Sequence, residues 1–548
     1  MDQFDELVES VVGPVADVLS AIVFAEIPIF GGIPIIVLWL MVAALFLTIW
    51  LKFQPITGAR HSFKVITGKF TRKTDPGEIS SFQALATELS GTIGLGNIAG
   101  VAVAVSVGGP GAALWIAAFG LLGMSVKMAE ATLGVVFRRV NDDGTISGGP
   151  MYYLRDGLKS IGWKKLGGVL AWLYALFTLL GVYGADLFQS NQVAAILSSS
   201  IGNEFLQNNN WLLGVIIAVL VGLVIIGGVT SIGKWTSRIT PAMAGLYLLS
   251  VVAIIVVNFD QLGPALASMV EGVISPSGVA GGAIGVAVIG IQRSLFSNAA
   301  GVGTAGFAHS ASKTRRPASE GFNAMWGPFF DSVVVCMLTA TAIVVTGVDD
   351  NVGADVEGVT LTASAFATVA SWFPYLLTIA VTLFGFSTVL AYAYYFEQAG
   401  VYIFGDSAAT RWILKGIWVI GPIIGASASL NAVITFADAS FFLMAIPNLL
   451  GIDFLANVLR REILSYREAV SGGHIDEAHQ QLQVGLGDHE PSEDDEALAA
   501  KIDAQGIDDG PYDPQGPRHG IDKSVYTSTS NDSPEPGSTS GSSTARDV

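Results

Sequence analysis

The sequence predicts an all-α integral membrane protein of about 11 transmembrane helices, built as two inverted repeats of five helices with one broken helix in each. Three observations support this prediction. Hydrophobic residues make up 51% of the 548-residue chain and charged residues only 13%, whereas soluble proteins carry about a quarter charged residues. Apolar runs long enough to cross a bilayer recur along the chain. Lys and Arg are concentrated in alternate loops between those runs.

Each apolar run of about 20 residues is predicted to form one membrane span. The eleven runs have the approximate limits 31–53, 82–107, 110–138, 168–200, 211–230, 239–258, 278–308, 321–346, 362–404, 411–429 and 431–457. The ninth run is long enough to require tilt or a helical extension outside the bilayer.

Lys and Arg indicate the orientation of the spans, because basic residues concentrate in cytoplasmic loops. They follow spans 1, 3, 5, 7 and 11 and open span 10, whereas the segments 1–30, 201–210, 259–277 and 347–361 contain none. This alternation predicts a multi-pass protein of the cell membrane with its N-terminus outside and its C-terminus in the cytoplasm.

The second span carries four glycines around one amide. Between Ser90 and Gly111 these residues are Gly91, Gly94, Gly96, Asn97 and Gly100. A glycine inside a helix costs about 1 kcal/mol relative to alanine, and an interrupted helix persists at membrane depth only where it lines a cavity or is buried in protein. The pattern therefore predicts a broken helix. Close packing of helices through small residues is the alternative.

The seventh span repeats this pattern between Phe296 and Gly306, with Gly301, Gly303 and the amide Asn298. Glycine-interrupted spans in corresponding positions of two halves indicate a transporter binding site. Spans 2–6 and spans 7–11 each contain five helices and begin on opposite sides of the membrane. This parity predicts an inverted 5+5 repeat, with span 1 as an addition.

Broken helices offer two kinds of unpaired backbone group. Their N–H groups favour a carboxylate, and their carbonyl groups favour a cation. A zwitterionic amino acid carried together with Na⁺ satisfies both kinds of group, so the two breaks predict transport of such a pair.

Six runs of the sequence are distinctive. They are TIGLGNIAGVAVAVSVGGPGA (92–112), KMAEATLGVVF (127–137), GTISGGPMYYLRDGL (144–158), QRSLFSNAAGVGTA (292–305), FGFSTVLAYAYYFE (384–397) and LMAIPNLL (443–450). Over nearly the whole of residues 1–457, the chain resembles the alanine or glycine:cation symporter family. The resemblance implies the leucine-transporter fold and symport of small amino acids, chiefly alanine and glycine, with Na⁺ and sometimes H⁺.

The resemblance also implies a substrate site between the two breaks. The residues carried over to it are Gly94, Gly96, Asn97, Phe188, Gln189, Phe296, Ser297, Asn298, Gly301 and Tyr392. The backbone of the first break would receive the substrate carboxylate. The second break would enclose the amino group and the small side chain.

One Na⁺ site is implied in the same way. Its ligands would be the hydroxyl groups of Ser387 and Thr388 in span 9 and the carbonyl groups of Ser90 and Ile93. Oxygen ligands suit a hard cation. Hydroxyl groups that bond to carbonyls of their own helix are the alternative. No organic cofactor is expected beside the transported ion.

Three positions depart from the family motifs. Ala299 stands where the family has a carboxylate, Ala391-Tyr392 replaces Gly-Trp, and Asp186 replaces an asparagine. These changes leave the substrate less well defined than the fold.

Four further polar residues lie inside predicted spans. Asp331, near the middle of span 8, is either a proton site or a structural partner of a neighbouring helix. Lys127 and Glu130 are spaced to pair within one helix. Arg293 is expected to anchor an outer gate with an acid such as Asp186.

The two ends of the chain differ in composition from the transporter domain predicted over residues 31–469. Residues 1–30 contain six acids and no Lys or Arg, which does not fit a secretory signal peptide. We expect an extracellular amphipathic helix over residues 1–25, with a frayed terminus as the alternative. Residues 470–548 are expected to form an acidic, disordered cytoplasmic tail.

Together these features predict Na⁺-coupled symport of a small neutral amino acid, alanine or glycine, into the cell by alternating access. The alternatives are H⁺ coupling or a different small amino acid on the same fold and, more distantly, a channel or a membrane enzyme. The sequence contains no nucleophile–base set and no phosphate-binding loop. We therefore expect no enzymatic activity and no nucleic-acid partner. The oligomeric state is left open.

Overall fold

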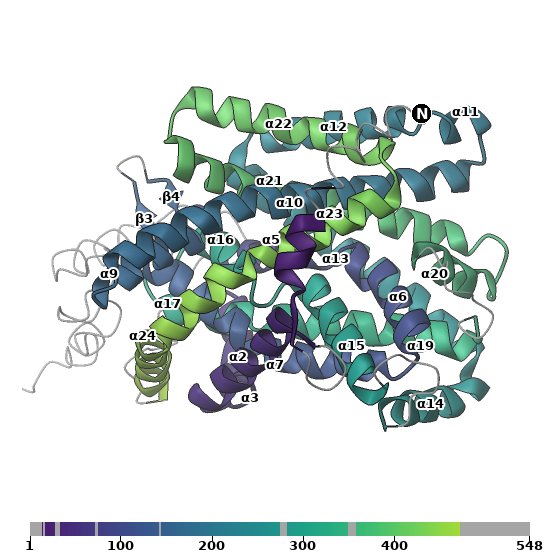
Figure 1. The fold of residues 1–548 in the computed structure, drawn as a ribbon, viewed down its shortest axis with the longest axis horizontal. Coiled ribbons are helices and arrows are strands. Elements are labelled where there is room, and N and C mark those ends of the chain that lie inside the picture. Colours follow the sequence, from purple (N-terminus) through teal and green to yellow (C-terminus); the bar gives the residue numbers. More distant parts are fainter. Residues whose placement is uncertain are drawn as a thin grey trace, which may run out of the picture.

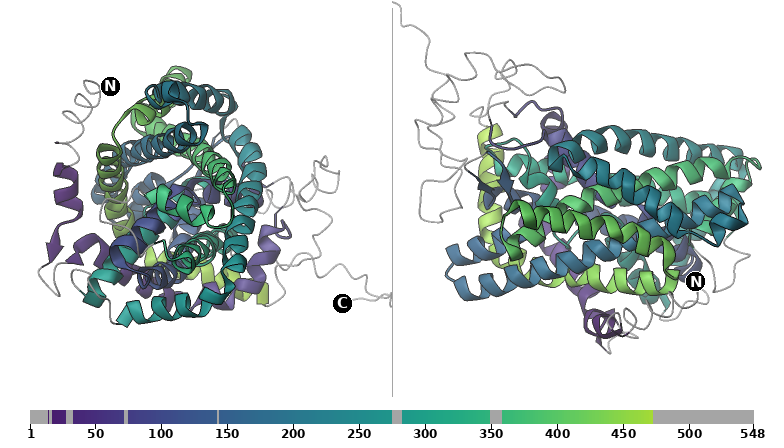
Figure 2. Two further views of the ribbon diagram at one scale, coloured as in Figure 1. Left: turned by 90° about the vertical axis from the view of Figure 1, so that its right-hand side faces the viewer. Right: turned by 90° about the horizontal axis from the view of Figure 1, so that it is seen from above.

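The computed structural model describes residues 14, 17–27, 33–71, 75–141, 144–274, 282–348 and 358–471. Most of the amphipathic helix predicted over residues 1–25, and nearly all of the tail predicted over residues 470–548, lie outside these ranges. Figures 1 and 2 show a bundle of long helices, most of which run along the longest axis of the molecule.

The named elements of the first half, among the described residues, are helices and two short hairpins. Its elements are β1 (Glu26–Ile27), β2 (Ile33–Pro34), α2 (Ile35–Trp50), α3 (Gln54–Thr57), α4 (Ala59–Ile66), α5 (Ser81–Thr92), η1 (Leu95–Asn97), α6 (Ala99–Gly108), α7 (Ala112–Val136), β3 (Arg139–Val140), β4 (Ile146–Ser147), α8 (Pro150–Tyr152), η2 (Tyr153–Gly157), α9 (Leu158–Ser160), α10 (Lys164–Ile201), α11 (Glu204–Gln207), α12 (Trp211–Ile225), α13 (Gly228–Val257), η3 (Phe259–Gln261) and α14 (Leu262–Ile274). Both hairpins are antiparallel: Glu26 pairs with Pro34, and Arg139 pairs with Ser147.

In the second half, all the named elements among the described residues are helices. Its elements are α15 (Gly282–Asn298), α16 (Thr304–Ser310), α17 (Pro317–Ala324), α18 (Trp326–Pro328), η4 (Phe329–Cys336), α19 (Met337–Thr346), α20 (Gly358–Ala367), α21 (Pro374–Phe404), α22 (Ala408–Ser427), α23 (Leu430–Leu443) and α24 (Ala445–Ser471). Helix α10 packs along α21, α22 and α23, and α7 packs along α15, α16 and α17. The two halves of the chain are therefore joined through α7 and α10.

Six helical stretches in the described part of the chain are long and apolar enough to cross a membrane. The bent pair Ser81–Thr92 and Leu95–Gly108 adds a seventh if it is counted as one span. Shorter apolar helices are Ile35–Trp50, Trp211–Ile225 and Gly358–Ala367. The architecture is thus that of a multi-pass membrane protein, and the number of eleven spans and the inverted repeat stay predictions.

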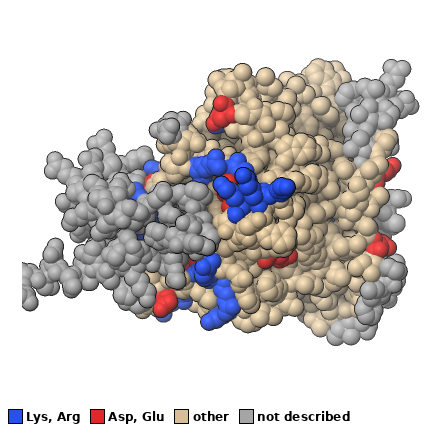
Figure 3. All heavy atoms as spheres, turned by 60° about the vertical axis from the view of Figure 1, so that its left-hand side comes forward, with Lys and Arg blue, Asp and Glu red and all other residues tan. Residues whose placement is uncertain are grey.

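The connecting segments lie at the two ends of the bundle, and those rich in Lys and Arg lie at one end. Hairpin β3–β4 and helices α9 and α17 lie at one end, whereas α11, α14 and α20 lie at the other (Figure 1). Figure 3 turns the first end forward and shows Lys and Arg side chains gathered on that side, beside a largely uncharged flank. The first end is the one that the sequence predicts to face the cytoplasm, and we call it the basic end.

The ninth predicted span, 362–404, is not one helix. It consists of α20 and α21, which are separated by residues 368–373. Pro374 occupies the first position of α21, where a proline is favoured because it has no N–H group to donate and its φ suits the helix. Because proline has no N–H group and its ring clashes with the carbonyl four residues earlier, a helix does not continue through it unbroken, and the apolar run divides here.

The helical structure that begins in the last predicted span, 431–457, continues beyond its predicted end. Helix α24 follows α23 directly after Met444 and continues to Ser471. The buried side chains of Leu459, Ile463 and Tyr466 extend the packed face of α24 beyond the predicted limit. The polar residues between them, which include Arg460 and Arg461, hid this extension from a criterion based on continuous apolar runs.

Candidate functional site

The first predicted break is present between α5 and α6. Helix α5 starts at a capping box in which the Ser80 hydroxyl accepts from the Gln83 N–H, and it ends at Thr92. Gly94 is extended, with φ −127° and ψ −155°. The chain then bends by 58° into η1 and α6. The Gly94 N–H donates to Asn97 Oδ1 at 3.2 Å, so this amide side chain caps the break from within.

The second predicted break lies between α15 and α16. Ala299, Gly301 and Gly303 all have positive φ angles, of 53°, 103° and 92°. Glycine adopts such angles without strain, whereas an alanine does so at a cost. The Asn298 side chain caps the end of α15, because its Oδ1 accepts from the Ala300 N–H at 2.9 Å.

The two broken helices approach each other at Gly96 and Phe296. A Cβ atom on Gly96 would lie 3.3 Å from Phe296 Cδ1 and 3.3 Å from Ser297 Cα. A side chain at position 96 would therefore push α15 away from η1. Absence of a side chain at Gly96 allows the first break to lie directly against α15.

Two polar side chains from other helices face the first break. A Cβ atom on Gly94 would lie 3.0 Å from both Gln189 Nε2 and Thr388 Oγ1, and Gln189 Oε1 accepts from the Leu95 N–H at 3.4 Å. Helix α10 supplies the amide and α21 supplies the hydroxyl. The structure therefore brings Gly94, Gln189 and Thr388 together, as the substrate and Na⁺ assignments require.

Four aromatic rings lie beside this polar group. Phe296 makes edge contacts with Phe188, at 5.7 Å between ring centroids, and with Phe441, at 5.8 Å. Phe441 in turn stacks on Tyr392 at 6.2 Å. Phe188, Phe296 and Tyr392 are thus near one another, and Phe441 on α23 is a member of the group that the sequence did not reveal.

The residues of the predicted Na⁺ site lie where α5 meets α21. Thr388 Oγ1 donates to the Ser90 carbonyl at 2.9 Å, and Ser90 Oγ donates to the Ser387 carbonyl at 2.7 Å. Both hydroxyl groups on α21 also lie 3.0 Å from the Phe384 carbonyl of their own helix. Ile93 is buried at the end of α5, three residues after Ser90. The hydroxyl groups therefore do both things: they cluster with the oxygens of α5, as a cation site would need, and they bond to a carbonyl of their own helix, as in the alternative interpretation.

Asn298 and Gly301 direct their polar groups elsewhere. Asn298 Nδ2 donates to Ser294 Oγ at 3.1 Å and to Ser332 Oγ at 2.9 Å. The Ser297 hydroxyl also lies 3.3 Å from that of Ser332. The Gly301 N–H donates to Glu130 on α7. These groups support the second break from η4 and α7 rather than facing Gln189.

Glu130 organises the second break, a role that the sequence analysis missed. Its Oε1 atom accepts from the N–H groups of Gly301 at 2.8 Å and Gly303 at 2.9 Å, and from Asn448 Nδ2 at 3.1 Å. Asn448 also donates to the Gly301 carbonyl at 2.7 Å, and it accepts a hydrogen bond from the Tyr153 hydroxyl. Helices α7 and α24 hold the break together through this carboxylate and amide.

Lys127 has a closer partner than the one predicted for it. Its Nζ atom is 3.0 Å from Glu88 Oε1 on α5 but 4.0 Å from Glu130 Oε2. It also donates to Thr304 Oγ1 at 2.9 Å. The local pair is the weaker contact because the backbone of the second break already binds the other oxygen of Glu130. Lys127 links α5 to α16 instead.

Asp331 contacts the first break. Its Oδ1 atom accepts from Asn97 Nδ2 at 2.7 Å, and the side chain is fully buried. This contact is a structural partnership with a neighbouring helix, one of the two alternatives that the sequence allows for Asp331. Its Oδ2 atom has no hydrogen-bond partner among the described residues. The carboxylate is therefore only partly satisfied.

The predicted pair of Arg293 with Asp186 is wrong. Arg293 Nη2 lies 3.3 Å from Asp438 Oδ2 on α23, whereas Asp186 Oδ1 accepts from Ser190 Oγ at 3.3 Å. Asp186 is fully buried on α10 and packs against Gly421 of α22, so it is enclosed between two helices. Asp438 and Arg293 are both partly exposed, so the arginine can reach this acid.

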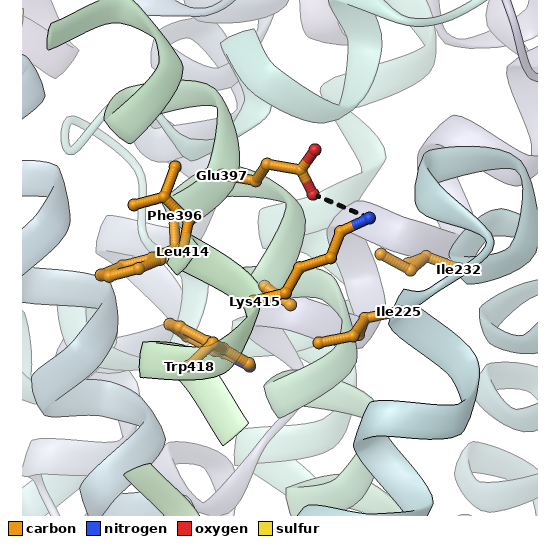
Figure 4. A pocket seen from close by; sticks show the side chains of 8 residues that line it. Ile225, Ile232, Phe396, Glu397, Leu414, Lys415 and Trp418 are labelled. Carbon is orange, nitrogen blue, oxygen red and sulfur yellow. Dashed lines mark ion pairs between the residues drawn. The ribbon is translucent and has the colours of Figure 1, made fainter. Parts of the chain in front are cut away.

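A small cavity lies apart from both breaks, between α12, α13, α21 and α22 (Figure 4). Its volume of about 10 Å³ is room for about one water molecule. Lys415 Nζ lies 3.6 Å from Glu397 Oε2, and Arg411 Nη1 lies 2.6 Å from Glu397 Oε1. The ion pairs tie α21 to α22, and a cavity of this size holds no amino acid.

Comparisons with known proteins agree on one kind of protein. The profile of the sodium:alanine symporter family matches residues 17–480. The sodium/alanine symporter AgcS of Methanococcus maripaludis is 36% identical over 79% of this chain and 94% of its own length. The probable sodium/glutamine symporter GlnT of Bacillus subtilis is 30% identical over 80% of this chain and 89% of its own length. Among solved structures, MhsT in complex with L-phenylalanine has a TM-score of 0.50 at 12% identity, covering 71% of this chain and 98% of its own.

Proposed function

The chain belongs to the sodium:alanine symporter family, and we propose that it carries a small neutral amino acid into the cell together with Na⁺. Members of this family are transporters rather than enzymes, so the chain is a multi-pass membrane protein for cation-coupled amino acid symport. The similarity to MhsT supports the leucine-transporter type of fold. Four points are part of what we propose: a small substrate, Na⁺ as the coupled ion, transport into the cell, and a transporter domain over residues 31–469.

One observation carries the proposal. At the first break, a backbone carbonyl and a hydroxyl, those of Ser90 and Thr388, lie beside backbone N–H groups and the amide of Gln189. Oxygen atoms suit a hard cation such as Na⁺, and backbone N–H groups at the start of a helix suit a carboxylate. Those of Gly94 and Leu95 donate to neutral amide oxygens, which a carboxylate can replace. A zwitterion and a cation can therefore bind next to each other at the place where α5 gives way to α6.

The second break supports the same position for the carboxylate. The N–H groups of Gly301 and Gly303 are already bonded to Glu130. A substrate carboxylate there would have to displace Glu130 from these N–H groups, whereas the N–H groups at the first break are held only by neutral amide oxygens. The first break is the better place for the carboxylate, and the second break contributes the apolar ring of Phe296.

The surroundings of the first break favour a small side chain. A Cβ atom on Gly91 would lie 2.8 Å from the Tyr392 ring, and Phe441 stacks on the same ring. The aromatic rings therefore fill the space next to the break. Relatives named for alanine and for glutamine differ in substrate size but share a neutral side chain, which supports a neutral amino acid here.

Uptake into lipid vesicles that contain the purified chain tests the proposal. With labelled alanine, glycine and glutamine, we expect alanine and glycine to accumulate under an inward Na⁺ gradient and glutamine to compete weakly. An H⁺ gradient without Na⁺ serves as the comparison. Uptake that needs no Na⁺ would contradict the proposed ion, and uptake without saturation or competition would indicate a channel.

Proton coupling through Asp331 is the second candidate, because its Oδ2 atom is buried and has no hydrogen-bond partner among the described residues. A buried carboxylate needs a cation or a proton. In the Na⁺ interpretation, Asp331 supplies a fixed negative charge behind Asn97, which caps the first break.

Asp331→Asn separates these two candidates. Loss of one buried charge near the ion is worth about 1.4 kcal/mol or more, so we expect the half-saturating Na⁺ concentration to rise by about tenfold. The neutral amide can still accept from Asn97, so the fold should persist. An unchanged Na⁺ dependence together with loss of uptake driven by H⁺ would favour proton coupling. Uptake at varied Na⁺ and at varied pH measures both.

A further inference from the structure

Buried ionisable side chains connect the halves of the two broken helices nearest the basic end. They are Glu88 on α5, Lys127 on α7, His309 on α16 and Glu320 on α17, all with 0% relative exposure. His309 lies between two acids: its Nε2 atom is 2.8 Å from Glu88 Oε2, and its Nδ1 atom is 2.7 Å from Glu320 Oε2. We name Glu88, His309 and Glu320 the acid–histidine triad.

The hydrogen bonds of the acid–histidine triad require one proton more than a neutral histidine supplies. An ionised carboxylate only accepts hydrogen bonds, and a neutral imidazole has one N–H group. Glu320 also accepts from Ser81 Oγ at 2.6 Å and from Asn323 Nδ2 at 3.1 Å. Glu88 faces Lys127 through its other oxygen. Because both acids are surrounded by donors, the additional proton belongs on the ring of His309.

The balance of charge agrees with this placement. Lys127 and a doubly protonated His309 offset the carboxylates of Glu88 and Glu320, whereas a neutral ring would leave one more negative charge unmatched in a dry interior that already holds Glu130.

Other charged and titratable groups lie on the helices packed around His309. Glu130 on α7 is bonded to the second break, and Arg138 is bonded to the carbonyl of Ser310 beside His309. On α21, the Tyr395 ring stacks on Phe307, and Tyr392 lies one turn before it. Glu462 on α24 is buried beyond α17.

The acid–histidine triad spans parts of the fold that meet at the basic end. Glu88 belongs to the first broken helix and His309 to the second. The same two segments also meet where Ile79 pairs with Ser312, and where Arg138 donates to the Pro76 carbonyl and to the carbonyls of Ser310, Ser312 and Thr314. The contact between Glu88 and His309 therefore exists only while α5 and α16 are together at this end.

We propose that the acid–histidine triad binds one proton while α5 and α16 are in contact at the basic end, and releases it when they separate. The proposal rests on the proposed function, because alternating access requires this end to open. Separation removes Glu88 from the ring and admits water, so His309 no longer needs both protons. Acid on the cytoplasmic side should therefore hold the transporter closed there, and alkali should favour opening.

The bound proton can be observed without transport. In the full chain in lipid vesicles, with histidine isotope-labelled at its ring nitrogens, we expect a nuclear magnetic resonance signal from a doubly protonated ring at neutral pH. His309→Gln should remove this signal and so assign it. In Glu320→Gln the amide can donate to Nδ1, so the same ring should become neutral. A neutral His309 ring in the unaltered chain, or a doubly protonated one in E320Q, would overturn the proposal.

The link to the transport cycle has its own measurement. Initial Na⁺-driven uptake should slow about threefold or more as the cytoplasmic-side pH falls from about 8 to about 6, the range in which an imidazole changes charge. E320Q should flatten this dependence, and Glu462→Gln, which removes a buried acid outside the triad, should keep it. An E320Q profile equal to that of the unaltered chain would overturn the link. Absence of uptake in every chain would instead defeat the proposed function and leave the resonance result standing.

Discussion

Glu130→Ala is expected to lower the free energy of unfolding by about 3–5 kcal/mol, the range for removing one partner from a buried charged network, and to abolish transport. The substitution leaves the N–H groups of Gly301 and Gly303 without their acceptor, and Asn448 loses a partner as well. Each buried donor left unpaired costs about 1–3 kcal/mol. The second break should open or collapse, because this carboxylate is what its backbone binds.

Two further variants sharpen this result. Glu130→Gln keeps an oxygen that can accept from both glycines but places an amide donor toward Lys127, so we expect a smaller loss, of about 1–3 kcal/mol. Asp406→Ala removes an acid from a partly exposed pair with Arg411, where the Asp406 side chain is 47% exposed, and should cost about 0–1 kcal/mol. Thermal unfolding in detergent measures all three. If E130A unfolds at the temperature of the unaltered chain, Glu130 does not support the break.

Local sequence pattern was enough to predict both breaks but not what holds them. Glycines and one amide within a few positions produce the bend at Gly94 and the positive φ angles at Gly301 and Gly303, and such patterns are visible in the sequence. The partners of Glu130 are 171, 173 and 318 positions away. Spacing along one helix suggested Lys127 instead, because it reports only neighbours on the same face.

The corrected pair of Arg293 shows the same limit. Both Asp186 and Asp438 lie in apolar helices, and the sequence does not show which of them stays near the outer surface. Packing decides: Asp186 is enclosed against α22, whereas Asp438 stays partly exposed on α23. The division of the ninth span is different, since Pro374 was a visible signal. The apolar composition is continuous on both sides of this proline, so hydropathy alone predicts a single span.

The hydroxyl groups of Ser387 and Thr388 allow two opposite expectations for Na⁺. If both hydroxyl groups are ligands, each substitution removes one oxygen contact from the charged ion, and that contact is worth about 1.5–3 kcal/mol. As groups that only bond to the Phe384 carbonyl of their own helix, they would affect Na⁺ little. The contact of Thr388 with the Ser90 carbonyl, across from α21 to α5, favours the first expectation.

We therefore expect Ser387→Ala combined with Thr388→Ala to raise the half-saturating Na⁺ concentration for uptake by about tenfold or more, since about 1.4 kcal/mol corresponds to tenfold. Thr382→Ala is the matched control, because its hydroxyl donates to the Thr378 carbonyl at 2.7 Å within the same helix. The control should change stability slightly and leave the Na⁺ dependence as it is. A double variant that folds and keeps the original half-saturating Na⁺ concentration would remove the ion from this position.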